Sequence, residues 1–235
     1  MSARRPLARS DWDDVRLVAF DVDGTLYSQF RLRRRMLRDL LGDAVSRRTP
    51  HVIKVLSVYR RIRERLAEEE TGDFERTLIA ATATVAERST DEVRAIVDQW
   101  IEKRPLRYLA ACSYPGVAEL FSGLRRKGKI VGVLSDYPAQ AKLAALGLNA
   151  DLIVCAGDPG IGVLKPNPRG LAALMKAAGT DAQTTVMIGD RATRDGGAAR
   201  RIGAWPLIRS RKPLADWQTF ARFDDPIFRN FLVTH

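Results

Sequence analysis

Residues 15–26 read VRLVAFDVDGTL, an apolar run that ends in two aspartates and a glycine. The run from 15 to 20 is rich in β-branched residues and meets a turn-forming glycine, which predicts a buried strand. Asp21 and Asp23 lie two residues apart where this strand ends, so both side chains can face one site. Two adjacent carboxylates repel each other unless a cation lies between them, so the pair indicates a divalent metal.

Four further apolar runs are bounded by turn-forming residues and are also predicted to be strands. None alternates with a period of two, which is typical of strands covered by helices on both faces. Helical patterns lie between them, and all four of these patterns end at glycine. The alternation favours an α/β fold with an open, Rossmann-like parallel sheet. The predicted strands are 129–135, 150–157, 184–190 and 204–208, and the predicted helices are 117–128, 139–147, 169–179 and 196–203.

Residues 27–110 interrupt the alternation, because they carry almost no strand pattern and several helical ones. Ser89 and Glu92 fit a capping box that opens the last of these helices. We therefore predict a helical domain over 27–110, inserted into an α/β core formed by 1–26 and 111–235. The tail after Leu207 is expected to form loops and a short helix. The helices predicted within the insert are 31–42, 51–70, 74–89 and 90–103.

Polar residues follow the other strands as well. Ser135 and Asp136 end the second strand, where a hydroxyl and the following backbone N–H can hold a phosphate. Lys165 follows the third strand, and the adjacent prolines restrict its position. Asp190 ends the fourth strand and Asp195 comes five residues later. Ligands of open α/β sheets bind at the carboxyl ends of the strands, so we expect one shared site.

Taken in order, these residues resemble the four motifs of the haloacid dehalogenase (HAD) superfamily of hydrolases. The motifs are Asp21-Val-Asp23-Gly-Thr25, Ser135, Lys165 and Gly-Asp190-x4-Asp195, and the match runs from Val15 to about Pro206. The resemblance implies a core sheet of strand order 3-2-1-4-5. It also identifies the insert as a C1-type cap, similar to that of the phosphoglycolate-phosphatase-like subgroup, with Tyr114-Pro115-Gly116 as its hinge.

The resemblance implies a role for each motif residue. Asp21 corresponds to the nucleophile that forms an aspartyl phosphate, and Asp23 to the general acid and base. Ser135 and Lys165 correspond to the clamp on the phosphoryl oxygens, which Asp136 extends. Thr25 is assigned to the turn that positions Asp23 and to the phosphate site.

The resemblance also implies the cofactor Mg2+. The metal would be held by the Asp21 side chain, the Asp23 backbone carbonyl and Asp190. Asp195 would support the metal site or orient Lys165 from behind.

The second aspartate of the first motif narrows the expected reaction. Dehalogenases and phosphonate hydrolases of the superfamily lack it, and its ion pumps read DKTGT, so Asp23 disfavours all three. We expect a Mg2+-dependent phosphatase that acts on a small phosphorylated metabolite. Two alternatives stay open at this point, which are a sugar phosphomutase of the same fold and a non-catalytic basic binding protein.

The formal charge of +11 is concentrated in the insert, where 31–65 holds twelve basic residues against three acidic ones. Such a segment attracts nucleic acid, anionic lipid or a phosphorylated substrate. Nucleic acid is disfavoured, because no aromatic residues interleave with the arginines as a single-strand platform requires. A further hypothesis is that the arginines nearest the nucleophile select an extra anionic group on the substrate. These are Arg31, Arg33, Arg34 and Arg35.

The sequence shows no apolar run of the roughly 18 residues that a membrane-spanning helix needs, so no stable membrane insertion is expected. The two cysteines are too few for a disulfide framework, and the N-terminal residues lack the apolar stretch of a secretory signal. These features predict a cytoplasmic protein. They do not indicate its oligomeric state.

Overall fold

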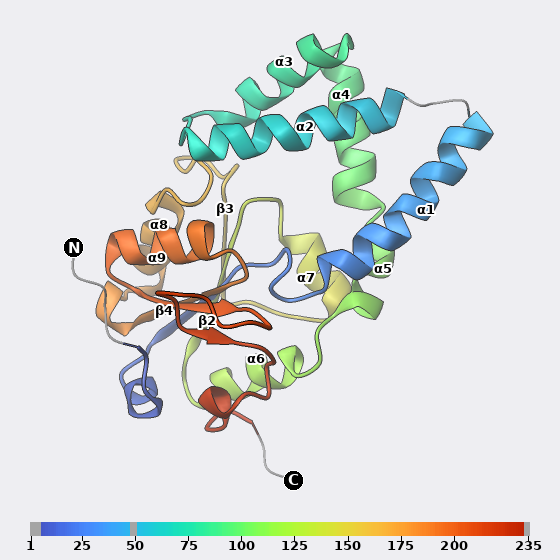
Figure 1. The fold of residues 1–235 in the computed structure, drawn as a ribbon. Helices are drawn as coiled ribbons and strands as arrows, with labels where there is room; N and C mark the ends of the chain where they lie inside the picture. The colour runs from blue at the N-terminus through green and yellow to red at the C-terminus, as the bar shows by residue number, and fades with distance from the viewer. Residues whose placement is uncertain (1–5, 48–50, 233–235) are drawn as a thin grey trace.

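The computed structural model describes residues 6–47 and 51–232 of the chain. The predicted core therefore has its first five and last three residues outside the described part, and the insert has residues 48–50 outside it. A six-stranded sheet lies at the centre, with helices on both faces and further helices above one edge (Figure 1).

The sheet has the order β3-β2-β1-β4-β5-β6, and every neighbouring pair is parallel. The expected α/β class and the order 3-2-1-4-5 are confirmed, with one strand added at the edge. The strands are β1 (Leu17–Phe20), β2 (Ile130–Ser135), β3 (Leu152–Cys155), β4 (Thr185–Gly189), β5 (Trp205–Arg209) and β6 (Thr219–Phe220).

The two faces of the sheet bury different residues of β1, as the alternation of strand side chains requires. Leu17 and Ala19 pack in one cluster with residues of α8 and α9, and Val18 and Phe20 in another with residues of α6 and α7. The two helix pairs lie on opposite sides of the sheet in Figure 1. They are α6 (Val117–Arg126) and α7 (Gln140–Leu146), and α8 (Arg169–Ala178) and α9 (Gly197–Ile202).

The tail after Leu207 is expected to form only loops and a short helix, and the structure corrects this expectation. It contains the 3-10 helix Pro226–Phe228, but it also adds β6 to the edge of the sheet. Two backbone hydrogen bonds fix this strand, from the Ile208 N–H to the Gln218 carbonyl (2.9 Å) and from the Ser210 N–H to the Phe220 carbonyl (2.8 Å). A strand of two residues shows no periodicity, so it could not be recognised from the pattern.

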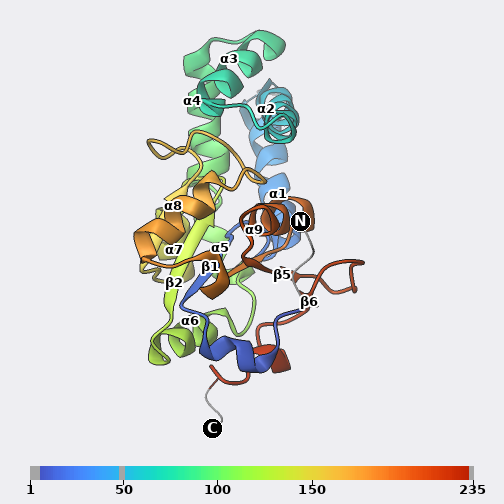
Figure 2. The ribbon, with the colours of Figure 1, turned by 90° about the vertical axis from the view of Figure 1, so that its left-hand side faces the viewer.

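The inserted stretch folds into helices that stand over the carboxyl ends of the strands (Figure 2). The expected helix over 90–103 is an α-helix that continues as a π-helix, and its Ser89–Glu92 capping box is confirmed. A helix at 106–112 was not expected. The elements are α1 (Gln29–Arg47), α2 (His51–Glu68), α3 (Phe74–Ala86), α4 (Thr90–Val97), the π-helix η2 (Asp98–Lys103) and α5 (Leu106–Cys112).

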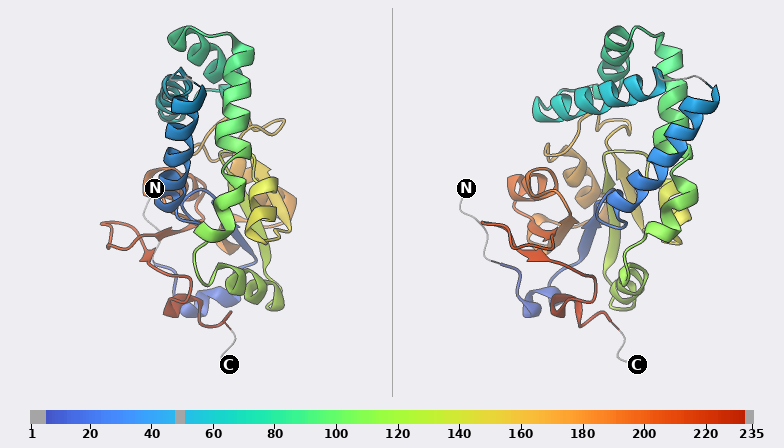
Figure 3. Two further views of the ribbon diagram at one scale, coloured as in Figure 1. Left: turned by 90° about the vertical axis from the view of Figure 1, so that its right-hand side faces the viewer. Right: turned by 45° about the vertical axis from the view of Figure 1, so that its right-hand side comes forward.

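Two packing arrangements hold the inserted helices together. Residues of α2, α3 and α4 form an apolar cluster of their own, which includes Val55, Phe74 and Val93. The remaining helix, α1, runs beside the column formed by α4, η2 and α5 (Figure 3). Asp43 accepts from Arg104 (3.2 Å) across that contact. Within the described residues, no helix is long and apolar enough to cross a membrane.

The two connections between insert and sheet lie side by side. Ser28 N–H donates to the Cys112 carbonyl (2.9 Å), and Tyr114 N–H donates to the Leu26 carbonyl (3.0 Å). The predicted hinge at Tyr114-Pro115-Gly116 is therefore hydrogen-bonded to the segment that leaves β1. Gly116 has a φ of +85° and its missing Cβ faces Phe223 at 3.1 Å, so a side chain there would be strained.

Candidate active site

Asp21 is buried directly after β1, and both of its carboxylate oxygens have partners. Oδ1 accepts from Lys165 Nζ (2.6 Å), and Oδ2 accepts from Thr25 Oγ1 (2.9 Å). Burial raises the pKa of Asp21 well above its ordinary value, because the loss of hydration outweighs the attraction of Lys165. Asp195, Asp190 and Asp23 raise this pKa further. A carboxylate in this position is costly unless more positive charge comes close to it.

Lys165 connects two of the predicted acidic residues. Its Nζ contacts Asp21 Oδ1 and Asp195 Oδ1 (2.7 Å) and also donates to the Leu134 carbonyl (3.2 Å). Burial lowers the pKa of Lys165, but Asp195 and Asp21 together raise it well above its usual value. The lysine is therefore a fixed cation beside Asp21.

The predicted phosphate-binding residues at the end of β2 surround this lysine. The side chain of Asp136 accepts from the Lys165 backbone N–H (3.1 Å), so it positions the lysine segment. Ser135 is fully buried, and its Oγ accepts from the Tyr137 N–H (3.2 Å). Thr25 contacts Asp21 directly.

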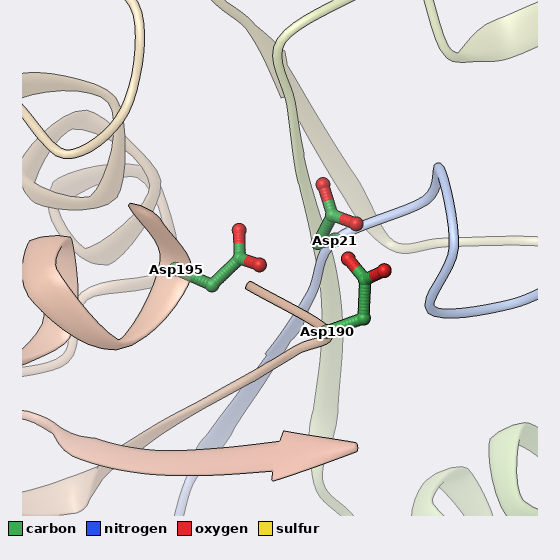
Figure 4. A group of neighbouring side chains, drawn as sticks. All are labelled: Asp21, Asp190 and Asp195. Carbon is green, nitrogen blue, oxygen red and sulfur yellow. The ribbon is translucent and has the colours of Figure 1, made fainter. Parts of the chain in front are cut away.

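Asp21, Asp190 and Asp195 each offer a carboxylate oxygen, and these oxygens lie within 4.8 Å of one another (Figure 4). Among the described residues, no group hydrogen-bonds the buried Oδ1 of Asp190. Burial and the charge of Asp195 raise the pKa of Asp190 to about 6. A cluster of carboxylate oxygens with one atom unpartnered fits a hard divalent cation such as Mg2+.

Gly24 and Asp195 each have a distinct part in this acidic group. A Cβ on Gly24 would lie 2.2 Å from Asp190 Oδ2, and its φ is +101°, so glycine is required there. Asp195 already has two partners, the Lys165 ammonium and the Arg191 N–H (2.9 Å). Its position behind Lys165 is compatible with the supporting role expected for it.

Asp23 turns its carboxylate to a different set of groups. Lys142 Nζ lies 2.6 Å from Oδ1 and 2.7 Å from Oδ2, and the Tyr27 hydroxyl donates to Oδ1. Burial raises the pKa of Asp23, but Lys142 and Tyr27 lower it more, so the net pKa lies below the ordinary value. The Asp23 carbonyl, an expected metal ligand, accepts from Gln29 Nε2 (2.7 Å).

A cavity of about 380 Å3 opens above Asp21 and Asp23 and is closed on its other side by the inserted helices. Of the four arginines expected to select a second anion, Arg33 lines it, and Arg31, Arg34 and Arg35 do not. Two residues of α2, Arg60 and Arg63, also line it.

The profile of the haloacid dehalogenase-like hydrolases matches residues 15–203, which cover most of the chain and all four motifs. The chain belongs to this family. This match confirms the resemblance that the four motifs showed, and the chain is called the HAD-like hydrolase below.

Three relatives that match part of this chain are named as phosphatases. A phosphoglycolate phosphatase of Rhodospirillum rubrum is 33% identical over 122 residues, which cover 49% of this chain and 50% of that protein. One of Mesorhizobium japonicum is 34% identical over 34% of this chain and 37% of its own length. The HAD-like hydrolase thus spans half or less of these two relatives. A glyceraldehyde 3-phosphate phosphatase of Methanopyrus kandleri is 25% identical over 80% of this chain and 81% of its own length.

Solved structures share the fold of this HAD-like hydrolase. A HAD-hydrolase of Bacillus subtilis aligns over 90% of this chain and 96% of its own, with a TM-score of 0.65 and 15% identity. A 2-haloacid dehalogenase of Pseudomonas syringae aligns over 86% and 90%, with a TM-score of 0.60 and 23% identity.

One contact between α2 and the core of this HAD-like hydrolase was not predicted from the sequence. Both carboxylate oxygens of Glu64, on α2, accept from Arg191 (2.9 and 2.7 Å). Arg194 donates to Glu64 Oε2 and to the Glu64 carbonyl, both at 3.0 Å, and to the Lys165 carbonyl (2.9 Å). Arg194 is buried, with 5% of its surface exposed. The three residues form a clamp, called here the Glu64 clamp, which joins α2 to the segment that follows β4.

Lys142 is the other site residue that the motifs miss, although the sequence held a signal for it. Ala139, Lys142 and Leu143 are all buried and lie on one face of α7. A lysine within the apolar stripe of a short helix is unusual and indicates a buried partner.

Proposed function

We propose that this hydrolase is a Mg2+-dependent phosphatase that forms an aspartyl phosphate on Asp21. The observation that best supports this proposal is the environment of Asp21. Its buried carboxylate is held through both oxygens, and it lies beside an Asp190 oxygen that lacks a partner among the described residues. The names of the relatives from Rhodospirillum rubrum and Methanopyrus kandleri support a phosphorylated small molecule as substrate.

The metal would be held by the Asp21 and Asp190 carboxylates together with the Asp23 carbonyl. Bound there, Mg2+ supplies positive charge to the phosphoryl oxygens and lowers the cost of the clustered carboxylates. The crystal structure of the Bacillus subtilis HAD-hydrolase is of a protein bound to magnesium, which supports this choice of ion. Asp195 would keep Lys165 in place behind the site.

In the first half of the reaction, one carboxylate oxygen of Asp21 attacks phosphorus. The bond from phosphorus to the alcohol oxygen breaks, and the alcohol leaves with a proton. That proton passes from Lys142 Nζ, 2.6 Å from Asp23, through the Asp23 carboxylate to the alcohol oxygen, which leaves Asp23 a carboxylate and Lys142 a neutral amine. Lys165 and the Ser135–Asp136 turn hold the charge of the transferred phosphoryl group, where electrostatic stabilisation contributes most.

In the second half, water attacks the phosphorus of the aspartyl phosphate. The bond from phosphorus to Asp21 breaks, inorganic phosphate leaves, and the water proton passes to Asp23 and back to Lys142. The lowered pKa of Asp23 suits this step, because the residue starts it as a carboxylate. The helical cap over 27–110 would exclude other water from the cavity while the intermediate exists.

Phosphate release from 4-nitrophenyl phosphate, assayed with Mg2+ and with EDTA, tests this function. We expect release to fall by about 100-fold or more in EDTA, because a bound cation contributes several kcal/mol to charge stabilisation. Readdition of Mg2+ in excess is the control and should restore the rate. If EDTA leaves the rate of phosphate release unchanged, the metal assignment is wrong. If no phosphate is released from any ester with any metal, the assignment as a phosphatase is wrong.

Substitution Glu64→Gln tests the Glu64 clamp. It weakens an ion pair whose Glu64 side chain is 49% exposed, so the closed cap loses on the order of 1 kcal/mol. We expect the KM for 4-nitrophenyl phosphate to rise about fivefold while the melting temperature stays within about 2 °C. Glu69→Gln is the matched control, because Glu69, directly after α2, pairs only with Arg65 among the described ion pairs. Equal KM values for the two variants would contradict a role of the clamp in closure.

A further inference from the structure

A second cavity, of about 300 Å3, adjoins the first on the side of α1. The two cavities adjoin at five residues that line both, which are Asp23, Gln29, Arg33, Arg60 and Tyr137. The second cavity is within the size range of small-ligand pockets. Its remaining walls come largely from apolar side chains of α1, η2 and the following turn, namely Leu32, Met36, Leu37, Leu40, Trp100, Ile101 and Pro105.

We infer that this apolar pocket receives the alcohol part of the substrate, so that the substrate is a phosphomonoester whose alcohol carries a hydrocarbon chain or ring. The inference rests on the proposed function and makes it more specific. Asp23 lies at the junction, where the alcohol oxygen of an ester bound at Asp21 would sit. The rest of the alcohol must extend away from Asp21, and the pocket begins at that point.

The polar groups of the pocket do not oppose an apolar occupant. Lys142 and Tyr27 both donate to the Asp23 carboxylate, so a hydrocarbon placed against these three residues leaves none without a partner. Arg33 and Arg60 are both exposed and stand at the rim shared by the two cavities. Both also line the first cavity, where their charge can meet that of a phosphoryl group.

The outer wall of the pocket is open at Leu37, which is 54% exposed although it lines the cavity. Leu41 lies one turn further along α1, is 52% exposed and does not line the pocket. A chain that fills the pocket would cover Leu37 and stop short of Leu41. The two leucines therefore form a matched pair for substitution.

An alcohol that carries a second negative charge is disfavoured in this pocket. A carboxylate within these walls would lose hydration without a buried cation to replace it, because Lys142 is already paired with Asp23 and the other two lining cations, Arg33 and Arg60, are exposed. The hypothesis that the basic cap selects an extra anion predicts preference for phosphoglycolate over alkyl phosphates. The apolar pocket predicts the reverse.

Binding of a series of n-alkylphosphonates, from ethyl to octyl, tests the inference by titration calorimetry in Mg2+. These compounds lack a hydrolysable ester, so the result does not depend on turnover. We expect affinity to increase about fourfold per added methylene until the pocket is filled. Leu37→Asp should reduce this dependence to less than about twofold per methylene, and Leu41→Asp should leave it as in the parent protein.

Hydrolysis of the matching alkyl phosphates and of phosphoglycolate separates the two proposals. Chain-length-dependent binding without hydrolysis would uphold the apolar pocket and overturn the phosphatase. Mg2+-dependent hydrolysis with affinity independent of chain length, or with phosphoglycolate preferred, would overturn the apolar pocket and uphold the phosphatase. Equal slopes for Leu37→Asp and Leu41→Asp would also overturn the pocket as the binding site.

Discussion

Asp21→Asn is expected to lower kcat for phosphate release by about four orders of magnitude or more while the protein stays folded. The amide keeps the shape of the side chain and can still accept from Thr25, but it lacks the charge needed to attack phosphorus. Lys165 retains Asp195 as a partner at 2.7 Å, so the substitution does not leave a buried cation alone.

The same variant should be at least as stable as the parent protein when no metal is added. The raised pKa of Asp21 means that its ionisation opposes folding, and that the stability contributed by the protonated form is lost as the pH rises through the raised pKa. Removing this carboxyl therefore stabilises the protein more at neutral pH than near pH 4. Repulsion among Asp21, Asp190 and Asp195 also decreases.

Phosphate release in Mg2+ measures the first effect, and melting temperatures at pH 4, 6 and 8 in EDTA measure the second. Asp91→Asn, a change on a side chain that is 92% exposed, is the control for an aspartate outside the site. Activity of Asp21→Asn within tenfold of the parent protein would contradict the nucleophile assignment. A large loss of stability at neutral pH would contradict the electrostatic description.

The second large effect is expected for Lys142→Met, which keeps the length of the buried side chain and removes its charge. Asp23 would lose its counterion and part of its hydrogen bonding, and breaking a buried pair costs about 3–5 kcal/mol. We also expect kcat to fall by about 100-fold or more, because the proton that leaves with the alcohol loses its source.

The sign of the pH dependence follows from the pKa of Asp23. In the parent protein this pKa is lowered mainly by Lys142, against the effect of burial, so the stability gained from the pair is present above the ordinary carboxyl range and is lost as the pH falls through the lowered pKa. Without Lys142 the carboxyl protonates at higher pH. The destabilisation should therefore be larger at pH 8 than at pH 4, and the acid limb of the rate profile should move to higher pH.

Denaturant unfolding at pH 4, 6 and 8 and a pH–rate profile measure these changes. Lys176→Met, at an exposed position of α8, is the matched control for the loss of a lysine charge. A destabilisation that is equal at all three pH values would show that Lys142 contributes packing and not a charge to Asp23.

The core of the fold could be predicted from the sequence because each strand is a short apolar run with a turn at its end. VRLVAF and the later runs carry enough β-branched residues to be recognised alone, and the parallel orientation follows from the helices between them, whereas the strand order was implied by the resemblance to the HAD superfamily. The site residues of the motifs could be predicted for the same reason. Asp21, Ser135 and Asp190 all lie where strands end, and parallel strands bring their carboxyl ends to one edge.

The residues that were missed depend on packing between elements distant in sequence. Lys142 reaches Asp23 across 119 positions, and Arg194 reaches Glu64 across 130. The apolar stripe around Lys142 indicates a buried partner, but no local period or spacing says which residue the partner is, because the contact is determined by how a whole helix docks. The apolar pocket beside Asp23 is of the same kind, since its walls come from α1 and η2, which meet only in the folded cap.

Arg194 has one more consequence, because it donates both to the cap at Glu64 and to the core at Lys165. Separation of α2 from the core would carry one negative charge away and leave Arg191 and Arg194 unneutralised at the mouth of the cavity. The open form would then attract a phosphate ester more strongly than the closed form, with an association rate that decreases as salt is added. Closure returns Glu64 and cancels that charge, so capture of the ester and its hydrolysis take place in two different electrostatic fields.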